Sequence, residues 1–170
     1  TDPTGVSERP WGKWMRGWTA EENRHGDVLR TYLYLSGRLD MRVVDVTVQH
    51  LIRNGFDLGS NNDPYRSIVY ASFQERATKI SHANTGKLSE QCGDKALGNI
   101  CGLIAADEAR HEEAYKRFFA TVINIDASCG VTAFAEMMRQ KVAMPARLMN
   151  DGRSGLGLFE RFAVVAQKSG

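Results

Sequence analysis

Residues 97–122 form the segment that most constrains this chain, because buried-type side chains recur there at every third or fourth position. That spacing places them on one face of a single helix. The stripe consists of Leu97, Cys101, Ile104, Glu108, His111, Tyr115, Phe118 and Val122. Its two central members are polar, and a carboxylate buried without compensation is strongly destabilising. A metal ion would compensate it, since Glu-x-x-His directs an oxygen and an imidazole nitrogen at one point.

A second pair with the same spacing, Glu22 and His25, lies earlier in the chain and uses another of its four histidines. Two Glu-x-x-His pairs on separate helices are typical of four-helix bundles that hold a di-iron carboxylate site. Glu22 also fits an alternative role, in a capping box with Thr19 at the start of a helix. The matching pair downstream favours the metal role.

A third carboxylate, Glu75, lies on the apolar face of the helix predicted for residues 64–83. Its alternative role is an ion pair with Arg76 or Lys79. A helix that delivers a single Glu is, however, what a di-iron bundle requires in addition to the two pairs. Thr78 is one turn further along and is expected beside the metals.

The hydrophobic periodicity and the turn residues predict an all-α chain without strands. The expected helices are 19–36, 41–54, 64–83, 95–123, 132–144 and 158–167, after an irregular lead-in at 1–12 and with a turn at 84–95. A chain of 170 residues is long enough for one domain with a substantial core, so residues 1–170 are expected to form a single domain.

Composition excludes several classes of function. The net charge is +2 and Lys and Arg are scattered along the chain, which argues against nucleic-acid binding. No apolar run approaches the roughly 20 residues that a membrane helix needs. The three cysteines have no CxxC spacing, so reduced thiols are expected. No signal or transit peptide is recognisable at the start.

Six segments around these residues follow a recognisable pattern: WTAEENRHGD, YLYLSGRLDMR, SFQERATKISHANT, ICGLIAADEARHEEAY, FAEMMR and MPARLMNDGR. Together they resemble a known family, the plant-type soluble acyl-acyl carrier protein (ACP) desaturases, known also as stearoyl-ACP desaturases. The resemblance extends over nearly the whole chain. Ferritins and ribonucleotide reductase small subunits share the Glu-x-x-His pairs but not these surroundings.

The resemblance implies a ferritin-like, dimeric, plastid enzyme. It would use O2 and ferredoxin electrons to insert a cis double bond into an acyl chain on ACP, in fatty acid biosynthesis. By the same resemblance Glu22 and Glu108 would bridge two iron ions. His25 and His111 would be terminal ligands, one on each iron, and Glu75 would complete the iron bound by His111.

Other roles are implied for residues around the metals. Thr78 matches the family's active-site threonine, and Asp107 and Trp18 match positions near His25 that orient this ligand or pass electrons. The family's sixth ligand, a Glu on a preceding helix, lies upstream of Thr1, and the family continues past Gly170. The expected fold is therefore an incomplete ferritin-like four-helix bundle with five of six ligands.

Two alternatives to the desaturase remain open from the sequence. One is a ferritin-like iron-binding protein or oxidase with no acyl substrate. The other is an inactive truncated fragment whose Glu and His side chains form ordinary ion pairs. Residues 58–68 match the family less well, so the acyl length and the position of the double bond are not predicted.

Overall fold

The computed structural model describes residues 5–140, 142–152 and 157–169, and no strand occurs among them. The all-α prediction is therefore confirmed for this part of the chain. The chain forms two compact units, Thr1–Arg38 and Leu39–Gly170, which are described separately. The single domain expected from the sequence remains a prediction. No helix in the described ranges combines the length and the apolar character needed to cross a membrane.

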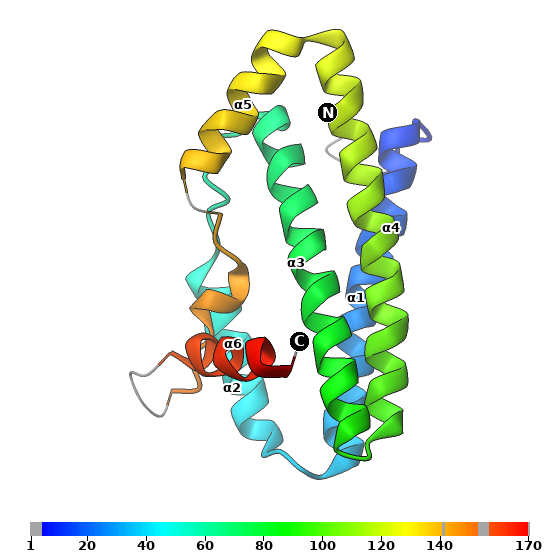
Figure 1. Cartoon of the computed structure of the whole chain (residues 1–170), viewed down its shortest axis with the longest axis vertical. Helices are drawn as coiled ribbons and strands as arrows, with labels where there is room; N and C mark the ends of the chain where they lie inside the picture. Colours follow the sequence, from blue (N-terminus) through cyan, green and yellow to red (C-terminus); the bar gives the residue numbers. More distant parts are fainter. Residues whose placement is uncertain (1–4, 141, 153–156, 170) are drawn as a thin grey trace. The chain divides into compact units, whose positions relative to one another are not determined.

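The first unit is built on one long helix, α1, which spans Pro10–Ser36 (Figure 1). Proline is favoured in the first helical turn because its fixed φ suits the helix and its missing N–H is not needed there. The helix ends at Gly37, whose left-handed conformation (φ 61°) is accessible to glycine at little cost.

The start of α1 differs from the expected start at residue 19. The segment before the helix folds back on it, and the Arg16 guanidinium donates hydrogen bonds to the carbonyl oxygens of Gly5 (2.9 Å) and Ser7 (2.8 Å). Thr19 consequently lies inside the helix and not at its N-terminus. The capping-box role considered for Glu22 is wrong, because a capping box requires its Thr at a helix start.

The second unit contains the remaining helices. They are α2 (Met41–Asn54), α3 (Pro64–Gln91), α4 (Lys95–Ile125), α5 (Ala127–Arg139), the 3₁₀ helix η1 (Pro145–Leu148) and α6 (Leu158–Ser169). Helices α3 and α4 run antiparallel and pack along their length, while α5 returns from the end of α4 toward α3 (Figure 1). The long α3–α4 hairpin is the frame on which the candidate site is built.

Aspartate side chains start four helices of this unit. A side-chain oxygen of each accepts a hydrogen bond from a backbone N–H of the first turn, which satisfies a donor that has no partner within the helix. The four residues are Asp40, Asp63, Asp94 and Asp126. At the other end of α2, Gly55 takes a positive φ and ends the helix as the sequence predicted.

In the second unit, the bounds of two helices were predicted wrongly. Helix α3 continues to Gln91 through most of the expected turn at 84–95, and within this extension the hydroxyls of Thr85 and Ser89 donate to carbonyl oxygens one turn earlier (2.8 and 2.7 Å). Helix α5 begins at Ala127 and not at residue 132, since Asp126 caps it. It accordingly ends at Arg139, short of the expected residue 144.

Close packing joins α3 to α4 and α5. A Cβ atom at Gly86 would lie 3.3 Å from the Cβ atom of Cys101, so the absence of a side chain allows α3 to approach α4 closely. Val69, Tyr70 and Met137 form the buried cluster that joins α3 to α5. This packing fixes α3 and α4 on both sides of the candidate site.

Candidate metal centre

The α3–α4 hairpin brings Glu75, Glu108 and His111 into direct contact. The Nδ1 atom of His111 lies 3.2 Å from Oε2 of Glu75 on the neighbouring helix and 3.4 Å from Oε2 of Glu108, one turn earlier on α4. The three side chains are nearly inaccessible, with residue exposures of 1%, 2% and 2%. Three of the five predicted metal ligands therefore converge in the interior of the second unit.

The predicted stripe on residues 97–122 is confirmed as the inner face of α4. Six of its eight members are buried, including Cys101, Ile104 and Tyr115, and the other two are partly buried. Burial raises the pKa of the Cys101 thiol, so this side chain remains a neutral core group at physiological pH. Glu108 and His111 are thus flanked by apolar packing on both sides along the helix.

The geometry of the three side chains fits a metal ion. Each of them offers one potential ligand atom, and these atoms lie within 4.8 Å of one another. Metal–oxygen bonds of about 2.1 Å place neighbouring ligands of an octahedral ion about 3 Å apart. The measured separations of 3.2 and 3.4 Å need only small side-chain adjustments to meet that requirement.

The charge of the group also favours a cation. Within this trio, one imidazolium balances only one of the two carboxylates. Charged groups removed from water are stable only with strong compensation, so burial makes a bound cation favourable here. Carboxylate and imidazole ligands together suit non-haem iron and related transition metals.

The other predicted pair, Glu22 and His25, lies on α1 in the first unit. Nδ1 of His25 is 3.7 Å from Oε2 of Glu22, so the two side chains face one another across one helical turn. His25 is buried and Glu22 is partly buried. This pair repeats the Glu108–His111 arrangement, and its participation in one shared site remains a prediction.

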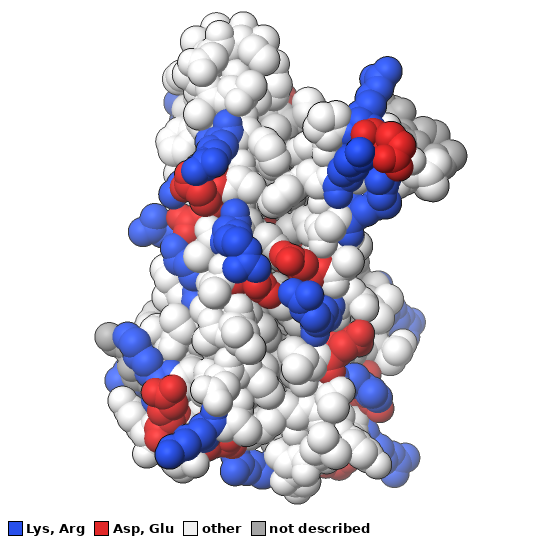
Figure 2. Space-filling view, turned by 90° about the vertical axis from the view of Figure 1, so that its right-hand side faces the viewer, with Lys and Arg blue, Asp and Glu red and all other residues white. Residues whose placement is uncertain are grey.

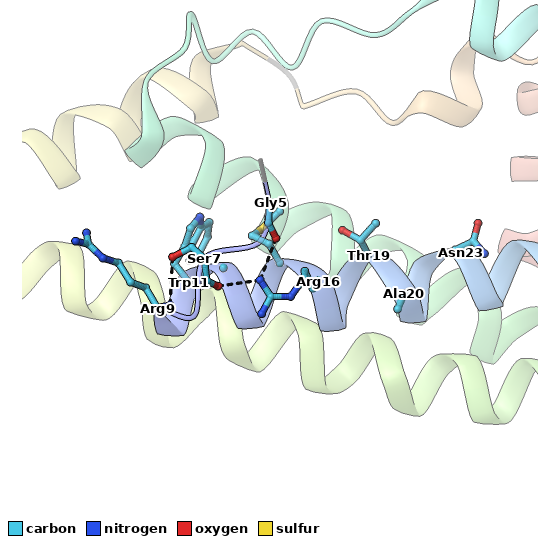
Figure 3. Close-up of a pocket in the computed structure, with 10 residues that line it drawn as sticks. Gly5, Ser7, Arg9, Trp11, Arg16, Thr19, Ala20 and Asn23 are labelled. Carbon is cyan, nitrogen blue, oxygen red and sulfur yellow. Dashed lines mark hydrogen bonds between the residues drawn. The ribbon is translucent and has the colours of Figure 1, made fainter. Parts of the chain in front are cut away.

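A pocket of about 1250 Å³ follows the N-terminal half of α1 (Figure 3). The guanidinium of Arg16 bridges the folded-back segment at Gly5 and Ser7, as the dashed lines in Figure 3 show. Trp11 and Thr19 also line the pocket. None of the predicted site residues is among the described residues that line it.

The structure also places the predicted residues around the metals. The Thr78 hydroxyl donates to the backbone carbonyls of Gln74 (3.1 Å) and Glu75 (3.0 Å), which ties it to the turn that carries Glu75. Asp107 forms an ion pair with Arg110 on its own helix. Trp18 is partly buried on α1. The roles predicted for these three residues remain predictions.

The two basic residues considered as partners of Glu75 reach another carboxylate. Arg76 and Lys79 both approach Glu112 on α4, and the alternative ion pair for Glu75 remains a prediction. Glu112 is only 5% exposed, and sequence reasoning missed it because it lies outside the apolar stripe. Lys116 follows Glu112 four residues later, a spacing typical of an exposed helical ion pair, so the sequence did not indicate that Glu112 is buried.

On the face drawn in Figure 2, basic side chains lie beside acidic ones. On α4, Glu113 has two basic neighbours, Lys116 at 3.2 Å and Arg117 at 2.9 Å. The hydrogen bond from Arg117, followed by that from Lys116, lowers the pKa of the Glu113 carboxyl. Such local ion pairs agree with the scatter of Lys and Arg expected from the sequence.

Comparison with known proteins gives these features a family. The sequence matches the family model described as fatty acid desaturase over residues 1–170. The chain belongs to the fatty acid desaturase family. This confirms the resemblance carried by the Glu-x-x-His segments, and it agrees with a ferritin-like class for the helices that bear them.

Individual desaturases are similar over almost the whole chain. One is stearoyl-[acyl-carrier-protein] 9-desaturase 6, chloroplastic, of Arabidopsis thaliana, which is 59% identical over 167 residues (98% of this chain and 42% of that protein). Another is acyl-[acyl-carrier-protein] desaturase 4, chloroplastic, of Oryza sativa subsp. japonica, which is 54% identical over 172 residues (99% and 41%). The chain spans about two fifths of the length of these curated relatives.

Proposed function

We propose that this chain carries the metal-binding helices of a di-iron acyl-ACP desaturase. The observation that supports the proposal most strongly is the buried contact of Glu75, Glu108 and His111, found in a member of the fatty acid desaturase family. Buried acidic side chains with this spacing are explained by a metal and are costly without one. The named relatives are acyl-ACP desaturases, which supports an acyl chain on ACP as the substrate.

The proposed ligands are the five predicted residues Glu22, His25, Glu75, Glu108 and His111. They would hold two iron ions, with Glu22 and Glu108 shared between them. Bound iron would allow O2 to act as the oxidant that an unactivated C–H bond requires, a role that acid–base side chains cannot fill. Overall, two hydrogen atoms leave the acyl chain, and O2 is reduced to two waters with two further electrons and two protons.

The protein side chains have separate tasks in this proposal. Glu75, Glu108 and His111 fix the positions of the ligand atoms, because packing on an apolar helix face restricts their rotamers. Their burial excludes water, which strengthens electrostatic interactions within the site and limits side reactions. The Thr78 hydroxyl, which donates to the Glu75 carbonyl oxygen, would hold a proton near the ligands in this proposal.

Further parts of the proposal rest on the family alone. Ferredoxin would deliver the electrons, and the working enzyme would be a homodimer. The location would be the plastid, in line with relatives named as chloroplastic proteins. Asp107 and Trp18 would assist His25 by orienting its ring or by passing electrons.

The test combines metal content with product analysis on the full-length protein. The protein is reconstituted with Fe(II), and its iron is measured by mass spectrometry. It is then incubated with saturated acyl-ACP, reduced ferredoxin and O2, and the fatty acids are analysed by gas chromatography. We expect bound iron and a monounsaturated product, and we expect His111→Ala to lose both.

Two results would contradict the proposal in different ways. Full iron occupancy with Fe(II) oxidation but no unsaturated product would indicate a ferritin-like oxidase without an acyl substrate. Absence of iron from a folded protein would indicate that the Glu and His side chains form ordinary ion pairs. The Glu113→Gln variant, changed at an exposed carboxylate on the same helix, controls for a general effect of removing an acid.

A further inference from the structure

Glu112 is a buried carboxylate that the proposed chemistry does not use. It is 5% exposed and lies directly after His111 on α4. Lys79 of α3 forms a short ion pair and hydrogen bond with Oε2 of Glu112. Arg76 and Lys116 lie further from the other oxygen, at 3.8 and 3.9 Å. The carboxylate is therefore held mainly by one lysine from the neighbouring helix.

The position of this ion pair relates it to the candidate metal centre. Lys79 lies one turn after Glu75, and a helical side chain leans toward the N-terminus of its helix, so Lys79 reaches back toward the level of Glu75. At that level, the contacts between α3 and α4 include Glu75–His111 in the interior and Lys79–Glu112 at the edge. The Lys79 side chain is one-third exposed, which is consistent with the edge of the interface.

Two contacts from adjacent residues restrict the rotation of a helix. His111 and Glu112 project about 100° apart around the axis of α4, since an α-helix has about 3.6 residues per turn. A rotation of α4 that moved His111 away from Glu75 would also pull Glu112 away from Lys79.

We propose that Lys79 and Glu112 are positioning residues, whose ion pair sets the rotation of α4 so that His111 faces Glu75. The inference rests on the proposed metal site and adds two residues that act through the ligands. Partners that orient ligand side chains contribute about 10–100-fold to metal affinity in other proteins. The effect expected here is about 10-fold, because the contact acts through one helix turn and not directly on a ligand.

The variants are chosen to separate positioning from loss of charge balance. Lys79→Met removes the ammonium and keeps most of the chain length, while Lys79→Arg keeps a cation that reaches Glu112. The double variant Lys79→Met/Glu112→Leu removes both charges, so a folded protein is expected even if Lys79→Met alone is unstable. Arg117→Gln is the matched control, because Arg117 pairs with the exposed Glu113 within α4 (2.9 Å) and does not bridge two helices.

Two measurements on the metal-free full-length protein give the readouts. Cobalt(II) titration, followed by visible absorption, reports affinity without requiring activity. Amide hydrogen exchange of residues 75–79 and 108–112 reports local order without any metal. We expect Lys79→Met and the double variant to bind cobalt about 10-fold more weakly and to exchange faster at both turns. Lys79→Arg and Arg117→Gln should remain within about threefold of the unmodified protein.

The inference would be overturned if the double variant kept full cobalt affinity and unchanged exchange. It would also be overturned if Lys79→Met lost affinity but the double variant recovered it, since the cause would then be an uncompensated charge. If the unmodified protein bound no cobalt, the proposed function would be contradicted. The exchange measurement would still decide whether this ion pair orders the two turns.

Discussion

Replacing Glu75 by leucine should stabilise the metal-free protein while abolishing metal binding. Glu75 is 1% exposed and shares the imidazole of His111 with Glu108. Its removal leaves a single carboxylate–imidazole pair whose charges can cancel. Replacing buried ionic groups by apolar residues of similar volume is often neutral or stabilising by about 1–4 kcal/mol. We expect the free energy of unfolding of the Glu75→Leu protein to rise within that range.

The assay is urea unfolding in the presence of a chelator, followed by circular dichroism. The chelator is essential, because a ligand that binds only the folded state stabilises it by an amount that grows with the logarithm of its concentration relative to its Kd. In excess Fe(II) the order of the two proteins by stability should reverse, because the unmodified protein gains stability and Glu75→Leu gains none. Glu113→Leu serves as the control, since its exposed ion pairs contribute little and its stability should change by less than about 1 kcal/mol.

If the free energy of unfolding of Glu75→Leu in the chelator were more than about 1 kcal/mol below that of the unmodified protein, this reasoning would be refuted. Such a result would mean that Glu75 contributes to stability as an ordinary buried ion pair, the loss of which is strongly destabilising. The buried carboxylates would then need no metal to explain them. An equal rise in the free energy of unfolding of both proteins on addition of Fe(II) would also contradict the assignment of Glu75 as a ligand.

Three further predictions concern the frame around the site, each measured by urea unfolding. Burial raises the pKa of Tyr70 to about 12, so its stabilising contribution is complete below about pH 10 and is lost as pH rises toward 12. In Tyr70→Phe the free energy of unfolding should fall less steeply over this pH range. The same pH dependence in the variant and the unmodified protein would contradict the prediction. Gly86→Val should lower the free energy of unfolding by about 1–3 kcal/mol, because the new side chain separates α3 from α4. Gly102→Ala is the control: a Cβ there meets no atom within 4 Å, so the free energy of unfolding should rise by about 0.5–1 kcal/mol. Equal effects of the two substitutions would exclude close packing as the cause. Asp63→Ala should lower the free energy of unfolding by about 1 kcal/mol, because the Asp63 carboxylate caps α3 by accepting hydrogen bonds of 2.7 and 3.1 Å. An unchanged free energy of unfolding would show that the cap is dispensable.

The interior of α4 was predictable because its signal is local. A stripe at three- and four-residue spacing specifies which side chains share a face, and a polar pair inside an apolar stripe marks a site. The same rule found Glu75 on α3. Helix ends were less predictable. The side chain of Asp126 caps α5 earlier than the expected start, and α3 continues through Thr85 and Ser89, where turn-forming composition favours a loop.

Glu112 shows where sequence reasoning stops. A Glu followed by Lys116 four residues later has the pattern of an exposed helical pair, and nothing in the local sequence indicates a buried carboxylate. The cause is Lys79, which lies 33 positions earlier in the chain and meets Glu112 only after α3 and α4 have paired. Contacts of this kind depend on the orientation of one helix about its axis relative to its neighbour. Hydrophobic periodicity does not fix that orientation to within one residue.

The most direct test of the metal centre is the number of iron ions bound by the full-length protein, measured together with its visible absorption, for the unmodified form and for His111→Ala. We expect two iron ions per chain in the unmodified form and a marked loss of iron in the variant. Equal iron content in the two proteins, or none in either while both remain folded, would contradict the claim that Glu75, Glu108 and His111 are ligands.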